Sequence, residues 1–301
     1  MEKLNVVVAL TTRENDYQAE QAVAAAEVAA RLGIKIQIIY ADNDAVNQTQ
    51  QLIKIIQDPA PPSAILVEPV GTGMPQVAKA AVGAGIGWGM INSDPEYIAE
   101  LRRGGGAPVF SVSTDQVEVG RIQGKQVGML LREGNVLYIE GPFNSTATQL
   151  RTKGMLSTKP AAVELKMLKG DWTEPSAHNA VRSWLSLGSS RQLQIRAVIC
   201  QNDAMARGAR KAFVGLTDKD REHWLNMPFT GCDGVTKTGQ EWVRRGLLTA
   251  TIITAPAAGI ALEILAKAFN AGSMPPDRTL IPPQSFPAIE ELRGKTMKAS
   301  G

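Results

Sequence analysis

The sequence contains only two cysteines and two histidines among its 301 residues. Cys200 and Cys232 are too few for a disulfide framework, and they lack the paired spacing of a zinc site. His178 and His223 lie far apart, with no cluster of cysteine or acidic residues beside either. We therefore expect two buried core thiols, two surface histidines, and neither a metal site nor a cofactor.

Long hydrophobic runs are also missing, since no stretch approaches the roughly 20 apolar residues of a membrane-spanning helix. The longest apolar runs, such as Val6–Leu10, have the length of a strand. That strand begins a few residues after Met1, so we expect no signal peptide in this chain. The chain is expected either to stay in the cytoplasm or to be an exported protein whose signal has been removed.

Charge of one sign is not in excess, because 32 basic residues stand against 29 acidic ones, for a net charge of +3. Such a balance does not favour nucleic acid or an anionic membrane as the partner. Hydrophobic residues make up 44% and charged residues 20%, which is typical of a water-soluble globular protein. The length allows two domains, each with a core of its own.

Short β-branched runs alternate with segments of helical periodicity in the first third of the chain. The alternation predicts strands at 5–10, 35–40, 64–67 and 87–91, and helices at 17–31, 45–57 and 73–84. Apolar strands bounded by helices indicate a parallel sheet covered on both faces. A polar segment at 94–108 interrupts the pattern, and its glycine run, Gly104–Gly106, is interpreted as a flexible connector.

The same alternation resumes after a crossover formed by a strand at 109–112 and a helix that begins near Asp115. It predicts strands at 135–139, 164–168, 197–200, 229–231 and 249–253, and helices at 146–156, 175–187, 203–213 and 235–245. A further helix at 257–269 has no obvious place in the second sheet, and we expect it on the first lobe. The predicted fold class is α/β, with two doubly wound, Rossmann-like lobes.

Polar residues follow many of the predicted strands, at the sheet edge where open α/β sheets bind ligands. Carboxylates and amides form hydrogen bonds with hydroxyl groups, arginine offers a planar set of donors, and tyrosine and tryptophan supply flat faces. These groups suit a sugar ring. The candidate ligand-binding residues are Arg13, Asp16, Tyr17, Glu68, Asn92, Thr114, Arg151, Trp172, Asn202, Asp233 and Thr254. A structural role in place of ligand binding stays open for four residues that can each cap a helix: Asp115, Asn202, Asp203 and Asp233.

No catalytic motif accompanies these residues. The chain has no Gly-x-Ser-x-Gly elbow, no Walker motif and no histidine among the candidates that could act as a general base. A hydrolase that pairs Asp16 or Glu68 with Asp233 stays open as an alternative, although paired acids bind hydroxyl groups equally well. We predict a binding protein rather than an enzyme.

Several short motifs occur in an order and spacing that resemble the ribose-binding type of periplasmic sugar-binding proteins of ABC transporters. This type shares its fold, periplasmic binding protein type I, with the effector domains of lactose-repressor-like regulators. The resemblance covers nearly the whole chain. It rests on QNDAMARGA at 201–209, GCDG at 231–234, GLLTATI at 246–252, STDQ at 113–116 with Gly120, IEG at 139–141, and Arg151 with Gly154.

The resemblance implies that one sugar binds between two lobes joined by a three-strand hinge, and that the closed form docks on a membrane permease. Asn202 and Asp233 match the family's ligand-binding amide and carboxylate, Arg151 its arginine, and Trp172 its aromatic platform. Tyr17 matches an aromatic residue after the first strand. Asn92 falls where the family places an acidic contact. The implied partners are a sugar and the permease, the implied location is the periplasm, and a monomer suffices.

The chain departs from the ribose pattern at four positions. Arg13 and Asp16 stand where that pattern has an amide and an aromatic ring, Glu68 replaces an amide, and Thr254 replaces a glutamine. Buried charges need partners to offset their desolvation. We therefore expect a ligand other than ribose, with a different arrangement of hydroxyl groups or with an amino or acidic group.

The expected lobes are 1–113 plus 255–277 and 114–254 plus 278–301. Hinge segments are predicted near 113–115, 253–255 and 276–280, where dihedral changes would allow the lobes to close on the ligand. The alternative function is the sensor core of a lactose-repressor-like transcription regulator without its DNA-binding module. No helix-turn-helix precedes the first strand, so this alternative requires a trimmed chain.

Overall fold

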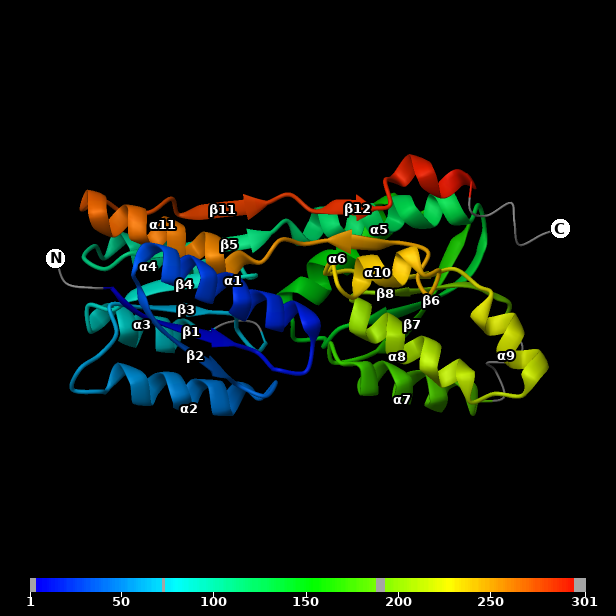
Figure 1. The fold of residues 1–301 in the computed structure, drawn as a ribbon, viewed down its shortest axis with the longest axis horizontal. Coiled ribbons are helices and arrows are strands. Elements are labelled where there is room, and N and C mark those ends of the chain that lie inside the picture. Colours follow the sequence, from blue (N-terminus) through cyan, green and yellow to red (C-terminus); the bar gives the residue numbers. More distant parts are fainter. Residues whose placement is uncertain (1–3, 72–73, 188–192, 295–301) are drawn as a thin grey trace. The chain divides into compact units, whose positions relative to one another are not determined.

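The computed structural model describes residues 4–71, 74–187 and 193–294, and the chain divides into two compact units. The first unit comprises Met1–Thr114 with Pro256–Ile281, and the second comprises Asp115–Ala255 with Pro282–Gly301. The chain therefore passes between the units three times. Each unit is an α/β structure with a parallel sheet, which confirms the predicted fold class (Figure 1).

The first unit contains a six-stranded parallel sheet in the order β2-β1-β3-β4-β5-β11. The direction of winding reverses between β1 and β3, and such a switch point leaves a crevice at the carboxyl ends of the strands. The strands are β1 (Asn5–Leu10), β2 (Lys35–Tyr40), β3 (Ala64–Val67), β4 (Gly87–Ile91), β5 (Val109–Thr114) and β11 (Arg278–Ile281).

Helices cover both faces of this sheet (Figure 1). They are α1 (Asp16–Leu32), α2 (Ala45–Ile56), α3 (Pro75–Gly83), α4 (Tyr97–Arg103) and α11 (Ala257–Ala271). One core cluster joins Val7 and Ala9 of β1 to α2, α3 and α4. Helices α1 and α11 pack against each other, and Gln21 accepts a hydrogen bond from the backbone of Ala258 at 2.8 Å.

The second unit has a four-stranded parallel sheet in the order β7-β6-β8-β9. Alternate residues of β6 face opposite cores: Leu137 and Ile139 pack with α7 and α8, whereas Val136 and Tyr138 pack with α5 and α6. The strands are β6 (Gly134–Glu140), β7 (Val163–Lys169), β8 (Ile195–Cys200) and β9 (Phe229–Thr230). The helices are α5 (Gln116–Leu130), α6 (Thr146–Thr158), α7 (Glu174–Leu185) and α8 (Asp203–Val214).

The remaining elements of the second unit are shorter. They are α9 (Asp218–Leu225), α10 (Gly239–Arg244), a 3-10 helix (Ile289–Gly294), and β10 (Thr251–Ile253), which pairs antiparallel with β12 (Gln284–Phe286). Isolated parallel bridges, Thr230 with Ala250 and Asp233 with Ile253, continue the main sheet toward β10. The chain that follows β9 is thereby fixed against β10.

Several elements differ from the sequence prediction. Helices α4 and α9 and strands β11 and β12 were not expected, and α10 is shorter than the predicted helix at 235–245. Residues 278–281 were expected in the second lobe, but β11 pairs in parallel with β5 and extends the sheet of the first unit. Thr114 ends β5 and belongs to the first unit, while Ala255 belongs to the second. Gly73, the predicted start of α3, lies outside the described residues.

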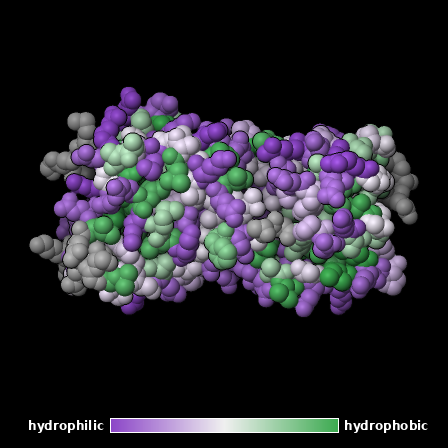
Figure 2. Space-filling model, turned by 180° about the vertical axis from the view of Figure 1, so that it is seen from behind, coloured by the Kyte–Doolittle hydropathy of each residue, from purple (hydrophilic) through white to green (hydrophobic). Residues whose placement is uncertain are grey.

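On the face of the molecule drawn in Figure 2, hydrophilic and hydrophobic residues are interspersed over the surface of each unit. Exposed large hydrophobic residues include Val46, Leu156 and Val214, on three different helices, and Phe143, between β6 and α6. Within the described part of the chain, no helix has both the length and the apolar character needed to span a membrane.

Candidate functional site

Three predicted site residues of the first unit form one hydrogen-bonded group where β1, β3 and β4 end. The Tyr17 hydroxyl donates to Oδ1 of Asn92 at 3.0 Å, and Nδ2 of Asn92 donates to Oε2 of Glu68 at 3.1 Å. Gln21 donates to the Tyr17 hydroxyl at 3.2 Å. The group lies beside the β1/β3 switch point, so the topology places an acid, an amide and a phenol where a polar ligand would bind.

The other candidates of the first unit have different surroundings. Arg13 is exposed, and its guanidinium carbon lies 4.4 Å from the centroid of the Tyr40 ring. Asp16 is exposed in the first turn of α1, where a carboxylate interacts favourably with the helix dipole. Thr114 is buried at the end of β5, and its hydroxyl has no hydrogen-bond partner within the described residues.

Arg151, on α6, is hydrogen-bonded to the start of α5 and to the residue that follows β8. It is 7% exposed, its Nε donates to Oε1 of Gln116 at 2.8 Å, and its Nη1 donates to the carbonyl oxygen of Gln201. Helix α6 reaches this position because it packs closely on α5 at two glycines. A Cβ on Gly120 would lie 1.9 Å from the carbonyl oxygen of Arg151, and one on Gly154 would lie 2.1 Å from that of Val117.

Trp172 contacts both Arg151 and Asn202. The guanidinium carbon of Arg151 lies 5.4 Å from the centroid of the Trp172 ring, an arrangement that favours a cation–π interaction. The indole lies against Gly141, where a Cβ would be 2.3 Å from Cζ2 of Trp172. Asn202 donates to the carbonyl oxygen of Trp172 at 2.9 Å and caps α8 by accepting from Met205 at 2.8 Å.

Asp233 follows β9 in a conformation that L-residues rarely adopt, with φ at 111° and 8% of the residue exposed. Its carbonyl oxygen accepts from the backbone N–H of Thr254 at 3.1 Å. The charges of both Arg151 and Asp233 act on the neighbouring Cys232 thiol. Burial is the largest cause of that thiol's raised pKa of about 12, while Arg151 lowers the pKa and Asp233 raises it. A cation and an anion are thus both within electrostatic range of Cys232.

The structure therefore groups Arg151, Trp172 and Asn202 by direct contacts and joins Asp233 to Thr254. Trp172, Asn202 and Asp233 follow β7, β8 and β9 at the carboxyl ends of the strands, in the sheet that has its switch point between β6 and β8. Residues 6–272 match the model of the periplasmic binding protein domain family. The chain belongs to this family.

Relatives of this periplasmic binding protein domain include the D-allose-binding periplasmic protein of Escherichia coli K12, which is 25% identical over 89% of this chain and 86% of its own length. The xylitol-binding protein of Mycolicibacterium smegmatis is 29% identical over 65% of this chain, a match that spans only 52% of that relative. An ABC transporter periplasmic solute-binding protein from Actinobacillus succinogenes 130z, solved with bound D-allose, has the same fold. Its TM-score is 0.80, with 20% identity over 97% of this chain and all of that one.

The helix-cap alternatives have different outcomes in this periplasmic binding protein domain. Asp115 and Asn202 do cap α5 and α8, so each has a local structural role. Asp233 does not cap the next helix, because α10 begins at Gly239 and its N-cap is Thr238. Of the histidines, His223 is exposed and His178 is half-buried. Cys200 and Cys232 are buried, and burial also raises the pKa of Cys200.

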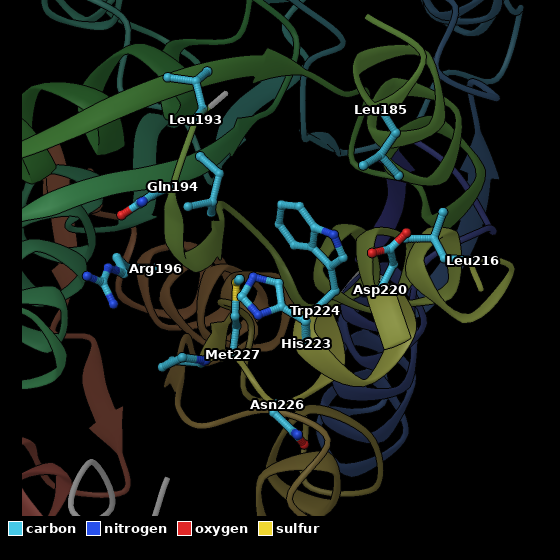
Figure 3. Close-up of a pocket in the computed structure, with 12 residues that line it drawn as sticks. Leu185, Leu193, Gln194, Arg196, Leu216, Asp220, His223, Trp224, Asn226 and Met227 are labelled. Atoms are coloured by element: carbon cyan, nitrogen blue, oxygen red, sulfur yellow. The ribbon is translucent and has the colours of Figure 1, made fainter. Parts of the chain in front are cut away.

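A separate pocket of about 850 Å³ lies in the second unit, beside the amino ends of β8 and β9 (Figure 3). Leu193, Trp224 and Met227 line it together with polar residues that include Arg196 and His223. None of the candidate site residues contributes to it. The pocket is therefore at the opposite end of the strands from Asn202 and Asp233.

Sequence reasoning missed the residues that hold the candidates in place. Gln21 supports Tyr17, Gln116 and Gln201 hold Arg151, and Asp203 binds the backbone next to Asp233. The motif QNDAMARGA was the available sequence signal for Gln201 and Asp203, because both residues flank Asn202 in it. Gln21 lies four residues after Tyr17 on α1, so the helical spacing was an available signal for that contact. Gln116 gave no such signal, because its partner Arg151 lies 35 residues away in the sequence.

Proposed function

We propose that the chain is a solute-binding protein that traps a monosaccharide, a sugar derivative or a polyol and delivers it to the permease of an ABC transporter. The observation that carries this proposal is the group of buried polar residues at the carboxyl ends of the strands, above all Arg151 packed on Trp172. A guanidinium fork beside an indole face offers hydrogen bonds to hydroxyl groups and an apolar surface to the C–H face of a sugar ring.

The binding residues of the proposal come from both units. Glu68, Asn92 and Tyr17 of the first, and Arg151 with Asp233 of the second, combine acceptors, donors and charges suited to several hydroxyl groups. Arg13, Asp16, Thr114, Trp172, Asn202 and Thr254 complete the proposed set. Binding by both units would stabilise a closed form, with the three passages of the chain between the units as the hinge.

Membership of the family and the names of its relatives, which include D-allose-binding and xylitol-binding proteins, support this ligand class. They do not favour the alternative of a transcription regulator's sensor core. We further propose that the protein works in the periplasm as a monomer and returns its ligand chemically unchanged. Ligand-dependent docking on the permease would then couple binding to transport.

A thermal-shift screen against D-allose, xylitol, myo-inositol, ribose, amino sugars and sugar acids tests the proposal, because a ligand that binds only the folded state raises the Tm. We expect one sugar or polyol to raise the Tm, and chromatography to recover it intact. The shift should disappear in Arg151→Ala and persist in Arg196→Ala, whose exposed arginine lies at the opposite end of the strands. No shift by any of these compounds, or conversion of the sugar, would contradict the proposal.

A further inference from the structure

Asp203, the first residue of α8, holds the backbone on both sides of Asp233. Its own N–H donates to the carbonyl oxygen of Cys232 at 2.6 Å. Its carboxylate accepts from the N–H of Gly234 through Oδ2 at 2.9 Å. The residue before Asp233 and the residue after it are therefore both hydrogen-bonded to Asp203, which is only 4% exposed.

The other carboxylate oxygen of Asp203 connects this segment to β10. Oδ1 accepts from the Thr251 hydroxyl at 2.7 Å in a buried hydrogen bond. The backbone N–H of Asp233 donates to the carbonyl oxygen of Ile252, the next residue of β10, at 2.9 Å. One carboxylate thus joins the start of α8, the segment after β9 and the strand β10.

The conformation of Asp233 explains why such support is needed. A φ of 111° is unfavourable for any residue with a side chain, and it persists only where the surroundings fix the backbone. Gly234 follows with φ at 60°, a value that glycine adopts without strain. Loss of the Gly234 hydrogen bond would let the segment relax and turn the Asp233 side chain away from its present direction.

Two glycines leave space for the Asp203 carboxylate. A Cβ on Gly231 would lie 2.1 Å from Oδ1, and a Cβ on Gly239 would lie 1.9 Å from Oδ2. These positions accept no side chain unless the carboxylate moves. The space for the carboxylate is therefore formed by Gly231, beside the segment that Asp203 holds, and by Gly239 at the start of α10.

We infer that Asp203 is a positioning residue for ligand binding, which fixes the direction of the Asp233 carboxylate without contacting the ligand itself. The inference rests on the proposed function, in which Asp233 binds a sugar hydroxyl group. Asp203 acts as a hydrogen-bond acceptor here. An isosteric amide should therefore replace it in part, since its oxygen can accept from Gly234 while its NH₂ donates to the Thr251 hydroxyl.

A double-mutant cycle tests whether Asp203 acts through Asp233. The affinity for D-allose and for xylitol is measured by calorimetry in the wild type, Asp203→Ala, Asp233→Ala and the double variant. We expect Asp203→Ala to weaken binding about tenfold or more in the wild-type background, yet less than about twofold in the Asp233→Ala background. Equal losses in both backgrounds would show a purely structural role and overturn the inference, as would unchanged affinity in Asp203→Ala.

Four further variants distinguish the loss of this hydrogen bond from a general loss of folding. Asp203→Asn should bind within about threefold of the wild type, because it retains the acceptor for Gly234. Val136→Ala, in the core of the same unit, should lower the Tm without changing the affinity. Gly239→Ala should weaken binding because its Cβ displaces the carboxylate. Gly215→Ala should not, because the nearest atom to its Cβ would be the carbonyl oxygen of Ala212 at 4.0 Å. Loss of binding in Asp203→Asn equal to that in Asp203→Ala would overturn the acceptor role.

Amide hydrogen exchange in the unliganded protein separates this inference from the proposed function. We expect faster exchange of the 231–234 segment in Asp203→Ala and near wild-type exchange in Asp203→Asn. Unchanged exchange of that segment in Asp203→Ala would overturn the inference even if the sugars bind. If neither sugar binds the wild type, or if Asp233→Ala binds as tightly as the wild type, the proposed function fails while the exchange result still decides the role of Asp203.

Discussion

The candidate residues of the two units are held by different kinds of contact. In the second unit, Arg151 and Asn202 are buried, and each donates a hydrogen bond to a backbone carbonyl oxygen. In the first unit, Tyr17, Asn92 and Glu68 are joined mainly side chain to side chain. Backbone acceptors cannot turn away as side chains can. The second unit thus holds its candidate residues in a fixed arrangement, while the side chains of the first have more freedom to rearrange.

The charged candidates of the two units also differ in exposure. Arg13 and Asp16 of the first unit are exposed, whereas Arg151 and Asp233 of the second are 7% and 8% exposed. Buried charges require partners, and the Arg151 guanidinium has them in Gln116 and Gln201. The comparison predicts that substitutions in the second unit affect both stability and affinity, while those in the first affect affinity selectively and less strongly.

The largest effect is expected where α5 and α6 approach each other. Gly120→Ala would place a Cβ 1.9 Å from the carbonyl oxygen of Arg151, so the helices must separate. We expect a loss of about 2–3 kcal/mol in the free energy of unfolding, together with weaker sugar binding because Arg151 moves. Urea denaturation measures the first effect and calorimetry the second.

Gly128→Ala is the matched control for this variant, since it lies in the same helix with only Pro160 at 3.5 Å from the added Cβ. It should be neutral or stabilise the protein by up to about 1 kcal/mol through helix propensity. Similar effects of the two substitutions would show that the close approach of the helices does not position Arg151.

A direct comparison of the two arginines gives the next largest effect. Arg151→Lys loses the planar fork that reaches Gln116 and Gln201 together, so we expect affinity to fall about tenfold, or 1.4 kcal/mol. Arg13→Lys keeps the charge at an exposed position beside Tyr40 and should change affinity less than about threefold. A larger effect at Arg13 would reverse the comparison between the units.

The strands of both sheets, except β11, could be predicted from sequence because their apolar runs are distinct. Lys35–Tyr40 and Gly87–Ile91 have the predicted bounds. Helix α9 was missed because its sequence, DKDREHWL, has no apolar stripe. Strand β11 was missed because four residues between Asp277 and Pro282 give too short a pattern, and its existence depends on the edge that β5 offers.

The sequence could predict the candidate residues that follow strands, but not the residues that hold them in place. Residues that follow strands are placed at the sheet edge by the topology alone, which is why Asn92 and Asn202 could be selected. Their supports could not be identified in this way. Gln116 meets Arg151 because two glycines bring α5 and α6 together, and Asp203 meets Gly234 because β9 neighbours β8. Such contacts depend on packing between segments distant in the sequence.

Two substitutions of Asn92 can separate the effect of backbone strain from the effect of lost side-chain hydrogen bonds in the first unit. Its φ of 54° suits asparagine or glycine better than alanine. Asn92→Gly and Asn92→Ala both remove the contacts to Tyr17 and Glu68, but only alanine adds strain. We expect alanine to be less stable than glycine by about 1 kcal/mol in urea denaturation, with equal losses of sugar affinity. Unequal affinities would show that backbone strain, rather than the lost side chain, controls binding.

The smallest effect concerns the thiols, which lie only in the second unit. Burial raises the pKa of Cys232 to about 12, whereas an unfolded thiol titrates near pH 8.5. Above about pH 8.5 the unfolded chain loses the proton of the Cys232 thiol, whereas the folded chain keeps it. The thiol's contribution to the free energy of unfolding is complete below that pH and is lost progressively as the pH rises toward 12. At pH 9 the loss from Cys232 should be under about 1 kcal/mol. Urea denaturation from pH 7 to 9.5 should show a shallower decline in Cys232→Ala, and an identical decline would mean that the thiol is solvated in the folded second unit.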